Sequence, residues 1–135
     1  MAQRRWTAAD AAAWITMPVA DDDKYSRGVL GIAAGSVRYP GAAVLAVEAS
    51  LRTGVGMVRF DAPVEVGALV LQRRPEAVLG AGRAQAWIAG PGMDVEDAEA
   101  AARVTAAIAA GTPIVLDAAA SARAGEAPGR SIVTP

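Results

Sequence analysis

The sequence predicts an α/β protein built around a mostly parallel β-sheet. Short apolar segments alternate with stretches of helical periodicity, and the clearest apolar segments are at about 28–34, 55–60, 86–89 and 113–117. Each segment is hydrophobic at nearly every position, which is typical of strands that helices cover on both faces. Strands that alternate with helices form βαβ units with right-handed crossovers, so the strands are expected to run parallel.

Composition restricts the possible functions of the chain. A length of 135 residues suits one domain, and a hydrophobic content of 53% with only 4% aromatic residues predicts a core of Ala, Val, Leu and Ile. The net charge is −1, without a basic stripe, which argues against a nucleic-acid partner. Cysteine and histidine are absent, so thiol chemistry, disulfides and the commonest metal ligand are excluded. No signal segment or membrane-length apolar run is present, so we expect a cytoplasmic protein without a membrane partner.

The N-terminal region is predicted to contain one short helix. Thr7 is a suitable N-cap for a helix over residues 7–15. We expect Trp6 and Trp14 to fasten this helix to the sheet, since they are its large apolar residues. The three aspartates at 21–23 offer ligands for a cation, but a solvated turn is the preferred interpretation.

The first strand leads into the best-defined helix of the sequence. The strand at about 28–34 is interrupted by Gly35 and Ser36. A helix then runs from about residue 41 to 53, and Gly54 is well placed as the residue that follows its C-cap.

The remaining elements continue the alternation. The strand at 55–60 precedes a helix from Pro63 to about Gln72, and residues 77–79 form a short third strand. After the strand at 86–89, Asp94 is expected to cap a helix from about 95 to 110. The strand at 113–117, a short helical piece, a Gly/Pro-containing loop and a last strand at 131–133 complete the chain.

Ligands of such sheets bind beyond the carboxyl ends of the strands, where several candidate residues occur. The features at these positions are Gly35-Ser36, Asp61, Gly90-Pro91-Gly92 and Asp117. The amides of Gly35 and Ser36, next to the helix start at Gly41, suit a phosphate or ribose-linked group. A plain strand-to-helix turn explains the same residues, and a plain turn also explains the Gly-Pro-Gly sequence. Asp117 could bind a substrate hydroxyl or water, or could cap the next turn.

Small residues follow Tyr39 at the start of the helix. Gly41, Ala42 and Ala43 would let a flat ligand approach the backbone, although close packing of helix on sheet explains these residues equally well. No phosphate-binding P-loop and no Gly-x-Gly-x-x-Gly fingerprint is present, so we predict neither of these nucleotide sites. We also predict no metal site formed by the chain itself.

Taken together, the motifs resemble the ADP/ATP-dependent NAD(P)H-hydrate dehydratases in order and spacing. The matching motifs are Lys24-x-x-Arg27-Gly28, Gly35-Ser36-x-x-Tyr39-x-Gly41-Ala42, Arg52-Thr53-Gly54-Val55-Gly56-Met57-Val58, Pro75-Glu76-Ala77, Gly90-Pro91-Gly92-Met93 and Pro113-Ile114-Val115-Leu116-Asp117-Ala118. The resemblance covers nearly all of the chain from Lys24 onward. It implies a three-layer α/β/α fold of the ribokinase-like type.

The resemblance also implies a function and a set of contacts. Members of that family use ADP or ATP, with Mg²⁺, to phosphorylate the hydroxyl of hydrated NADH or NADPH, after which phosphate leaves and the nicotinamide double bond is restored. The partners implied are therefore hydrated NADH or NADPH and an adenine nucleotide, and the complete protein is expected to be a homo-oligomer. In the family, the Gly-Ala element and the Gly-Pro-Gly loop face the hydrated dinucleotide, which corresponds here to Gly41, Ala42, Ala43, Gly90 and Gly92. Together with the candidates Gly35, Ser36, Tyr39 and Asp117 described above, these are the residues expected to contact substrate.

The departures from the family pattern concern the end of the chain. Asp94, Ala119 and Ser121 stand where the family usually has Gly, Asp and Leu. The later adenine-nucleotide segment, and the loop with the catalytic Asp, would lie beyond Pro135. We therefore interpret residues 1–135 as the N-terminal part of a single dehydratase domain, without the C-terminal catalytic half and without a catalytic residue. An apolar edge and face of the sheet should then be uncovered.

Two other functions fit the same residues. A ribokinase-like kinase that acts on a small molecule, such as a vitamin precursor, would also phosphorylate a hydroxyl. A degenerate fragment without catalytic activity is the other alternative, which Asp94 and Ala119 favour modestly.

Overall fold

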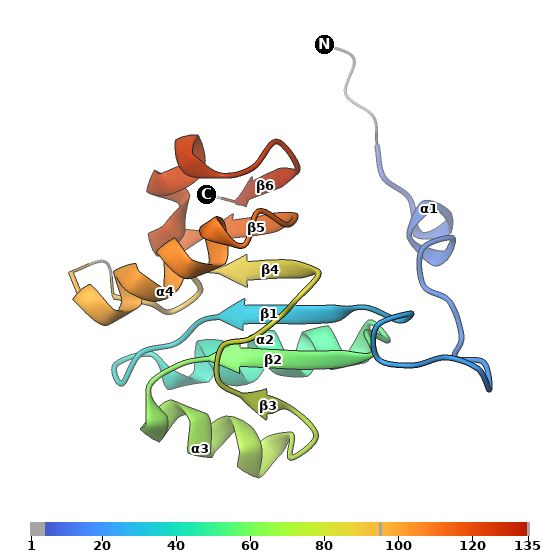
Figure 1. The fold of residues 1–135 in the computed structure, drawn as a ribbon, viewed down its shortest axis with the longest axis horizontal. Coiled ribbons are helices and arrows are strands. Elements are labelled where there is room, and N and C mark those ends of the chain that lie inside the picture. The colour runs from blue at the N-terminus through green and yellow to red at the C-terminus, as the bar shows by residue number, and fades with distance from the viewer. Residues whose placement is uncertain (1–4, 95, 135) are drawn as a thin grey trace.

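The computed structural model describes residues 5–94 and 96–134, and its centre is one six-stranded sheet (Figure 1). The strands are β1 (Val29–Ala33), β2 (Met57–Asp61), β3 (Val78–Leu79), β4 (Ala86–Ala89), β5 (Ile114–Asp117) and β6 (Ser131–Thr134). Their order across the sheet is β3-β2-β1-β4-β5-β6, and all five pairings are parallel. The predicted parallel α/β sheet is confirmed.

Helices cover both faces of this sheet. The helical elements are α1 (Ala8–Ala12), α2 (Pro40–Arg52), α3 (Val64–Arg73), α4 (Ala98–Ala109) and the 3-10 helix η1 (Ala118–Glu126). Figure 1 shows α2 behind the sheet and α4 in front of it, which gives the three predicted layers. None of the helices in the described part of the chain is long and apolar enough to cross a membrane.

The α2 and α3 layer packs on one face through aliphatic side chains and the only phenylalanine of the chain. Phe60, which is 1% exposed, lies in this cluster with Ile32 and Val58 of the strands and with the helix residues Val47, Val66 and Val70. Fully burying one such side chain contributes about 1.5–3 kcal/mol. This cluster therefore accounts for most of the attachment of α2 and α3 to the sheet.

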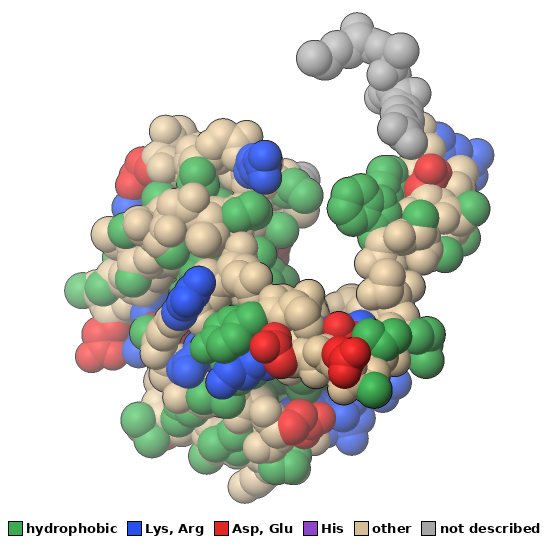
Figure 2. All heavy atoms as spheres, turned by 45° about the vertical axis from the view of Figure 1, so that its right-hand side comes forward, with side chains coloured by type: hydrophobic (Ala, Val, Ile, Leu, Met, Phe, Trp, Pro, Cys, Tyr) green, Lys and Arg blue, Asp and Glu red, His purple; other side chains and the backbone are tan. Residues whose placement is uncertain are grey.

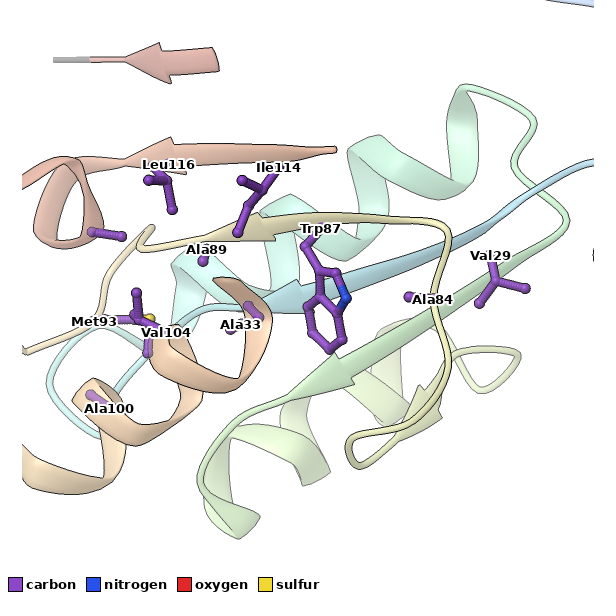
Figure 3. Close-up of a cluster of buried hydrophobic side chains, with 12 residues drawn as sticks. Val29, Ala33, Ala84, Trp87, Ala89, Met93, Ala100, Val104, Ile114 and Leu116 are labelled. Carbon is purple, nitrogen blue, oxygen red and sulfur yellow. The ribbon is translucent and has the colours of Figure 1, made fainter. Parts of the chain in front are cut away.

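The α4 layer packs on the opposite face through small residues and one tryptophan (Figure 3). Ala100 and Ala107 let α4 approach the sheet closely, since their side chains are at most 3% exposed. The indole of Trp87 lies against Gly31 of β1, where a Cβ would come within 2.5 Å of a ring carbon. Glycine is thus required at position 31 by the tryptophan, in the middle of a buried strand.

The start of α4 differs from the prediction. Asp97, not Asp94, is the N-cap, and its carboxylate accepts a hydrogen bond from the backbone N–H of Glu99 at 2.9 Å. The carboxylate of Asp94 accepts instead from the N–H of Glu96 at 3.1 Å and so stabilises the preceding turn. The helix therefore begins at Ala98, three residues later than predicted.

The attachment of the N-terminal helix also differs from the prediction. Thr7 and Asp10 form the capping box of α1, but this helix ends at Ala12 and buries none of its side chains. Trp6 is 56% exposed and Trp14 is 79% exposed, so the expectation that they fasten the helix to the sheet is wrong. Figure 1 shows α1 well separated from the sheet.

Arg27 fastens the N-terminal segment instead. Its guanidinium donates hydrogen bonds to the carbonyl oxygens of Thr16, at 2.9 Å, and of Gly54, the residue after α2 and its C-cap. It also forms an ion pair of 3.5 Å with Asp22. The second strand starts at Met57 rather than at residue 55; just before it, the N–H of Gly56 donates at 2.9 Å to the carbonyl of Gly28, the residue that precedes β1.

Part of the α2 side of the sheet is uncovered. A row of in-register residues crosses four strands, from Ile32 through Ile88 and Val115 to Ile132. Ile32 is fully buried beneath α2, whereas Ile132 is 62% exposed. A groove of about 210 Å³ runs along this region, and apolar side chains line nearly all of it. The predicted uncovered apolar face is therefore present over β4, β5 and β6.

An ion-pair network joins α2 to the end of α3. The carboxylate of Glu48 accepts hydrogen bonds from Arg74 and from Arg52, the latter at 2.6 Å. Arg73 approaches the same carboxylate at 3.5 Å. The guanidiniums of Arg74 and, next, Arg52 lower the pKa of Glu48 to about 2. One carboxylate therefore connects three arginines from two helical segments.

We expect Glu48→Gln to lower the melting temperature near neutral pH, because the amide cannot replace the charge in this network. A lowered pKa means that the stabilisation is fully present above the unfolded-state pKa of about 4.5 and is lost as the pH falls through about 2. Circular dichroism melting between pH ~7 and pH ~3 should thus show a smaller acid-dependent loss for the variant. Glu96→Gln, which changes an exposed carboxylate, is the control. Equal melting curves for both variants would contradict the proposed role of Glu48.

Candidate ligand-binding site

Three loops that the sequence marked as candidates meet at the carboxyl edge of the sheet. They follow β1, β4 and β5, which are neighbours in the sheet, and they lie to the left in Figure 1. Neighbouring strands are about 4.8 Å apart, so loops from adjacent strand ends come into contact. The topology therefore brings together residues as far apart in the sequence as Gly35 and Asp117.

Backbone hydrogen bonds hold the first two loops together. The N–H of Gly35 donates to the carbonyl of Pro91 at 2.7 Å, and the N–H of Gly90 donates to the carbonyl of Ala33 at 3.0 Å. Gly35 has a φ of +80°, which L-residues with a side chain adopt at a cost. The turn after β1 is thus fixed against the Gly-Pro-Gly loop.

Gly90 and Gly92 are required by close packing. A Cβ on Gly90 would lie 1.8 Å from the carbonyl oxygen of Asp117, and one on Gly92 would lie 2.3 Å from the Cβ of Ala42. Both glycines also have positive φ. They therefore connect the loop after β4 to the loop after β5 on one side and to the start of α2 on the other.

The start of α2 presents open backbone at Gly41. Nothing lies within 4 Å of where a Cβ on Gly41 would be, so space is free above this residue. Ala42 packs against Gly92, and the side chain of Ala43 is 1% exposed in the α2 core. Tyr39 is half exposed, and the Arg38 guanidinium lies over its ring at 5.2 Å. Among the predicted small residues, Gly41 is thus the one with room for a ligand.

The hydroxyl of Ser36 already has a local role. It accepts a hydrogen bond of 3.1 Å from the N–H of Tyr39, and the residue is 8% exposed. This contact stabilises the turn before α2. Any ligand at this position would therefore meet a hydroxyl that is held in a fixed orientation.

Asp117 lies at the end of β5, beside the end of β6. Its carboxylate accepts a hydrogen bond from the hydroxyl of Thr134, which is the residue in register with it. Ala118 follows with a φ of +44°, so the chain turns sharply away from the strand into η1. The sequence analysis did not identify Thr134 as a site residue. The only signal in the sequence that could have indicated it is the position of a polar residue at the end of an apolar strand.

Asp61, also at a strand end, is not part of the same group. Its carboxylate pairs with the Arg103 guanidinium of α4 at 3.3 Å, so it fixes α4 to the sheet. Within residues 5–94 and 96–134, no group of three or more acidic residues is arranged to hold a metal ion. Asp22 and Asp23 instead bond their own turn, where Asp23 accepts from the N–H of Tyr25 at 2.7 Å and Asp22 from the N–H of Val19 at 2.9 Å.

A cavity of about 290 Å³ lies at the opposite edge of the sheet, beside the amino ends of the strands. Trp14, Arg27 and Gly54 are among its lining residues. Since Arg27 already bonds the surrounding carbonyls and Asp22, this cavity is the junction where the N-terminal segment meets the body of the protein.

Solved structures define the class of protein to which this fold and edge belong. The ADP/ATP-dependent NAD(P)H-hydrate dehydratase of Bacillus subtilis, co-crystallised with ATP and Mg²⁺, aligns with a TM-score of 0.80 and 27% identity. The alignment covers 96% of this chain and 52% of that one. A ribokinase-like superfamily protein from Enterococcus faecalis aligns with a TM-score of 0.81 at 22% identity, which supports the fold. The chain thus has the ribokinase-like α/β fold.

Sequence comparisons identify the family within that class. The family model described as NAD(P)H-hydrate dehydratase matches residues 30–128. The bifunctional NAD(P)H-hydrate repair enzyme Nnr of Mycobacterium leprae is 41% identical over 116 residues, which are 82% of this chain and 24% of that enzyme. The ADP-dependent (S)-NAD(P)H-hydrate dehydratase of Xanthomonas campestris is 42% identical over 67 residues, 49% of this chain and 23% of its own length. The chain belongs to the NAD(P)H-hydrate dehydratase family.

The chain covers only part of each relative. The chain spans about a quarter of the length of the curated relatives it matches, and about half the length of the solved structures. The candidate residues of the three loops, from Gly35 to Asp117, lie inside the residues matched by the family model, whereas Thr134 at the end of β6 lies outside them.

We expect Gly90→Ala to disrupt the junction of the three loops. The added Cβ would clash with the Asp117 carbonyl, and the positive φ adds strain, so stability should fall by at least about 2 kcal/mol. Urea unfolding followed by tryptophan fluorescence measures this loss. Gly125→Ala is the matched control, since a Cβ there meets nothing within 4 Å, and it should stay within about 0.5 kcal/mol of wild type. A Gly90→Ala protein as stable as the control would show that the loops are less tightly packed than described.

Proposed function

We propose that the protein carrying this chain is a lyase that dehydrates hydrated NADH or NADPH with ADP or ATP, and that this chain provides the side of the site that binds the hydrated dinucleotide. Family membership over residues 30–128 supports the reaction. The observation that supports the site is the convergence of the loops after β1, β4 and β5 around glycines that leave open backbone at Gly41.

The chemistry needs a phosphoryl donor and a hydroxyl acceptor. The hydroxyl oxygen of the hydrate would attack the terminal phosphorus of the nucleotide and give up its proton to a base. The bond from that phosphorus to its bridging oxygen would break, which releases AMP from ADP or ADP from ATP and leaves a phosphate ester on the hydrate. The C–O bond then breaks, phosphate leaves with both bonding electrons, and loss of a ring proton restores the nicotinamide double bond. Phosphoryl transfer depends mainly on positioning and on charge stabilisation around the transferred group.

The residues of this chain are assigned to binding rather than to proton transfer. Gly35, Ser36, Tyr39 and Gly41 form the turn and helix start on one side of the proposed site. Gly92 orders Ala42, Ala43 follows in the same helix turn, and Gly90 orders the backbone of Asp117 on the other side. None of these residues is a suitable general base beside a phosphate cradle, so we place the catalytic residue outside the chain.

ADP or ATP with Mg²⁺ is proposed as the co-substrate. The Bacillus subtilis relative was co-crystallised with ATP and Mg²⁺, and the Xanthomonas campestris relative is named as ADP-dependent. Because no acidic cluster suited to a metal occurs in the described residues, the ion would be held through the nucleotide phosphates.

We further propose that residues 1–135 form the N-terminal part of one domain, and that additional polypeptide of the same domain covers the open face over β4, β5 and β6. The exposed row that ends at Ile132 supports this, as does the match to about half of the solved structures. A homo-oligomer in the cytoplasm is the proposed state of the complete protein. Exposed apolar side chains of the N-terminal segment, such as Trp14 and Met17, support subunit contacts.

The function is tested by incubating the full-length protein with NADH hydrate and ADP or ATP, while the recovery of NADH absorbance is followed. We expect turnover for the full-length protein and none above a heat-killed control for residues 1–135 alone, because removing a general base costs about 10²–10⁴-fold by itself. Turnover by residues 1–135 would place the catalytic centre inside this chain. Phosphorylation of hydroxymethylpyrimidine or thiazole alcohols, without NADH recovery, would favour the kinase alternative.

Gly41→Trp in the full-length protein tests the proposed binding surface. The side chain would occupy the free space above Gly41, so dinucleotide binding should be lost while the melting temperature changes little. Unchanged binding of NADH hydrate would show that this surface is not the site.

The proposed coverage of the open face over β4, β5 and β6 is tested with Ile132→Asp, both in residues 1–135 alone and in the full-length protein. In residues 1–135 alone the position is 62% exposed, so stability should change by less than about 1 kcal/mol. In the full-length protein the substitution should cost about 3 kcal/mol, because it would bury an unpaired charge under the additional polypeptide. Equal effects in both contexts would argue against coverage of this face.

A further inference from the structure

The ends of β5 and β6 bring together a carboxylate and a hydroxyl that the proposed function leaves without a defined role. Asp117 and Thr134 are in-register partners, and the Thr134 hydroxyl donates a hydrogen bond to Oδ1 of Asp117. Both residues are partly buried. Parallel pairing of the two strands therefore fixes the carboxylate from the neighbouring strand.

This carboxylate differs from the others near the same edge. Asp61 is paired with Arg103, and Asp94 bonds the N–H of its own turn. Within residues 5–94 and 96–134, Asp117 forms no ion pair, and the Thr134 hydroxyl is its hydrogen-bond donor. An ionised carboxylate has about four acceptor sites, so most of its acceptor capacity is unused.

The chemistry of such a group selects for hydroxyl ligands. A carboxylate without a cationic partner accepts hydrogen bonds from alcohols and repels phosphate. Carboxylates at strand ends of open α/β sheets bind ribose hydroxyls in this way. Because Asp117 borders the Gly90 loop, a hydroxyl bound there would lie inside the proposed site.

We propose that Asp117 accepts a hydrogen bond from a ribose-type hydroxyl of the ligand, and that Thr134 is the positioning residue that orients the carboxylate for it. This inference rests on the proposed function. Thr134 uses its only hydroxyl proton on Oδ1, so the second oxygen of Asp117 is left for the ligand. A methyl group in place of that hydroxyl would leave the carboxylate free to rotate.

The positions of the start of α2 and of Asp117 also predict how the ligand is oriented in the site. The strands β1 and β5 are separated by β4, so their ends lie about 10 Å apart. Phosphate groups would be placed near the start of α2, where a helix N-terminus favours negative charge. The ribose hydroxyl would be placed at Asp117, on the side without a cation.

The test uses the full-length protein and three variants. Thr134→Val removes the hydroxyl and keeps the shape, whereas Thr134→Ser keeps the hydroxyl. Thr112→Val is the matched control, because the Thr112 hydroxyl is buried and has no hydrogen-bond partner among the residues that the structure describes. Dissociation constants are measured by calorimetry for hydrated NADH and for analogues of it in which a ribose lacks its 2′-hydroxyl or its 3′-hydroxyl.

We expect Thr134→Val to weaken binding of hydrated NADH by about tenfold, with Thr134→Ser and Thr112→Val within about twofold of wild type. For the deoxy analogue that lacks the bound hydroxyl, the difference between wild type and Thr134→Val should disappear. A Thr134→Val protein that matches the control, or one that loses affinity equally for every analogue, would overturn the inference.

Failure of the proposed function gives a different result. A wild-type protein that binds neither hydrated NADH nor hydrated NADPH contradicts the proposed function. The same protein, labelled at the aspartate carboxylate carbons, is then titrated with ADP-ribose and with D-ribose while the Asp117 signal is followed by NMR. A shift that wild type shows and Thr134→Val lacks supports the hydroxyl site; no shift with either probe overturns it.

Discussion

Parallel pairing of β1 with both of its neighbours is the constraint on which the rest of the structure depends. Residues Leu30 to Ala33 pair in register with β2 on one side and with β4 on the other. All three strands therefore end at the same edge, and their following loops must share the space beyond it. The hydrogen bond from Gly35 to Pro91, and the contact of Gly90 with Asp117, follow from this arrangement.

Small residues make that arrangement possible. The loops meet at distances that leave no room for a Cβ on Gly90 or Gly92, and Gly31 gives its space to the indole of Trp87. Alanines do the same between α4 and the sheet. A core with few aromatic residues thus gains its stability from close approach of backbones rather than from large side chains. The loops of the candidate site are packed in the same way.

Helices cover the two faces of the sheet to different extents. The α4 face is closed over β4 and β5 by alanines, Val104 and η1. On the other face α2 and α3 cover β1 and β2, whereas the row through Val115 and Ile132 is open. In Figure 2, hydrophobic side chains are visible on the N-terminal segment and on the body of the protein, on either side of a gap between them. Apolar surface of this extent is typical of regions that contact further polypeptide.

The sequence alone determined the alternation of elements, the parallel sheet and the bounds of β4, because hydrophobic periodicity and Gly/Pro positions are local signals. It also determined which loops would be candidates, since Gly35, Gly90 and Asp117 follow apolar strands directly. Only the tertiary structure decided that Asp97 rather than Asp94 caps α4, and that Arg27 rather than Trp14 anchors the N-terminal segment. The anchoring by Arg27 depends on where the distant carbonyl of Gly54 lies. For the same reason the partnership of Asp117 with Thr134 became visible only in the folded chain: the register of β5 against β6 sets it, and no local pattern records that register.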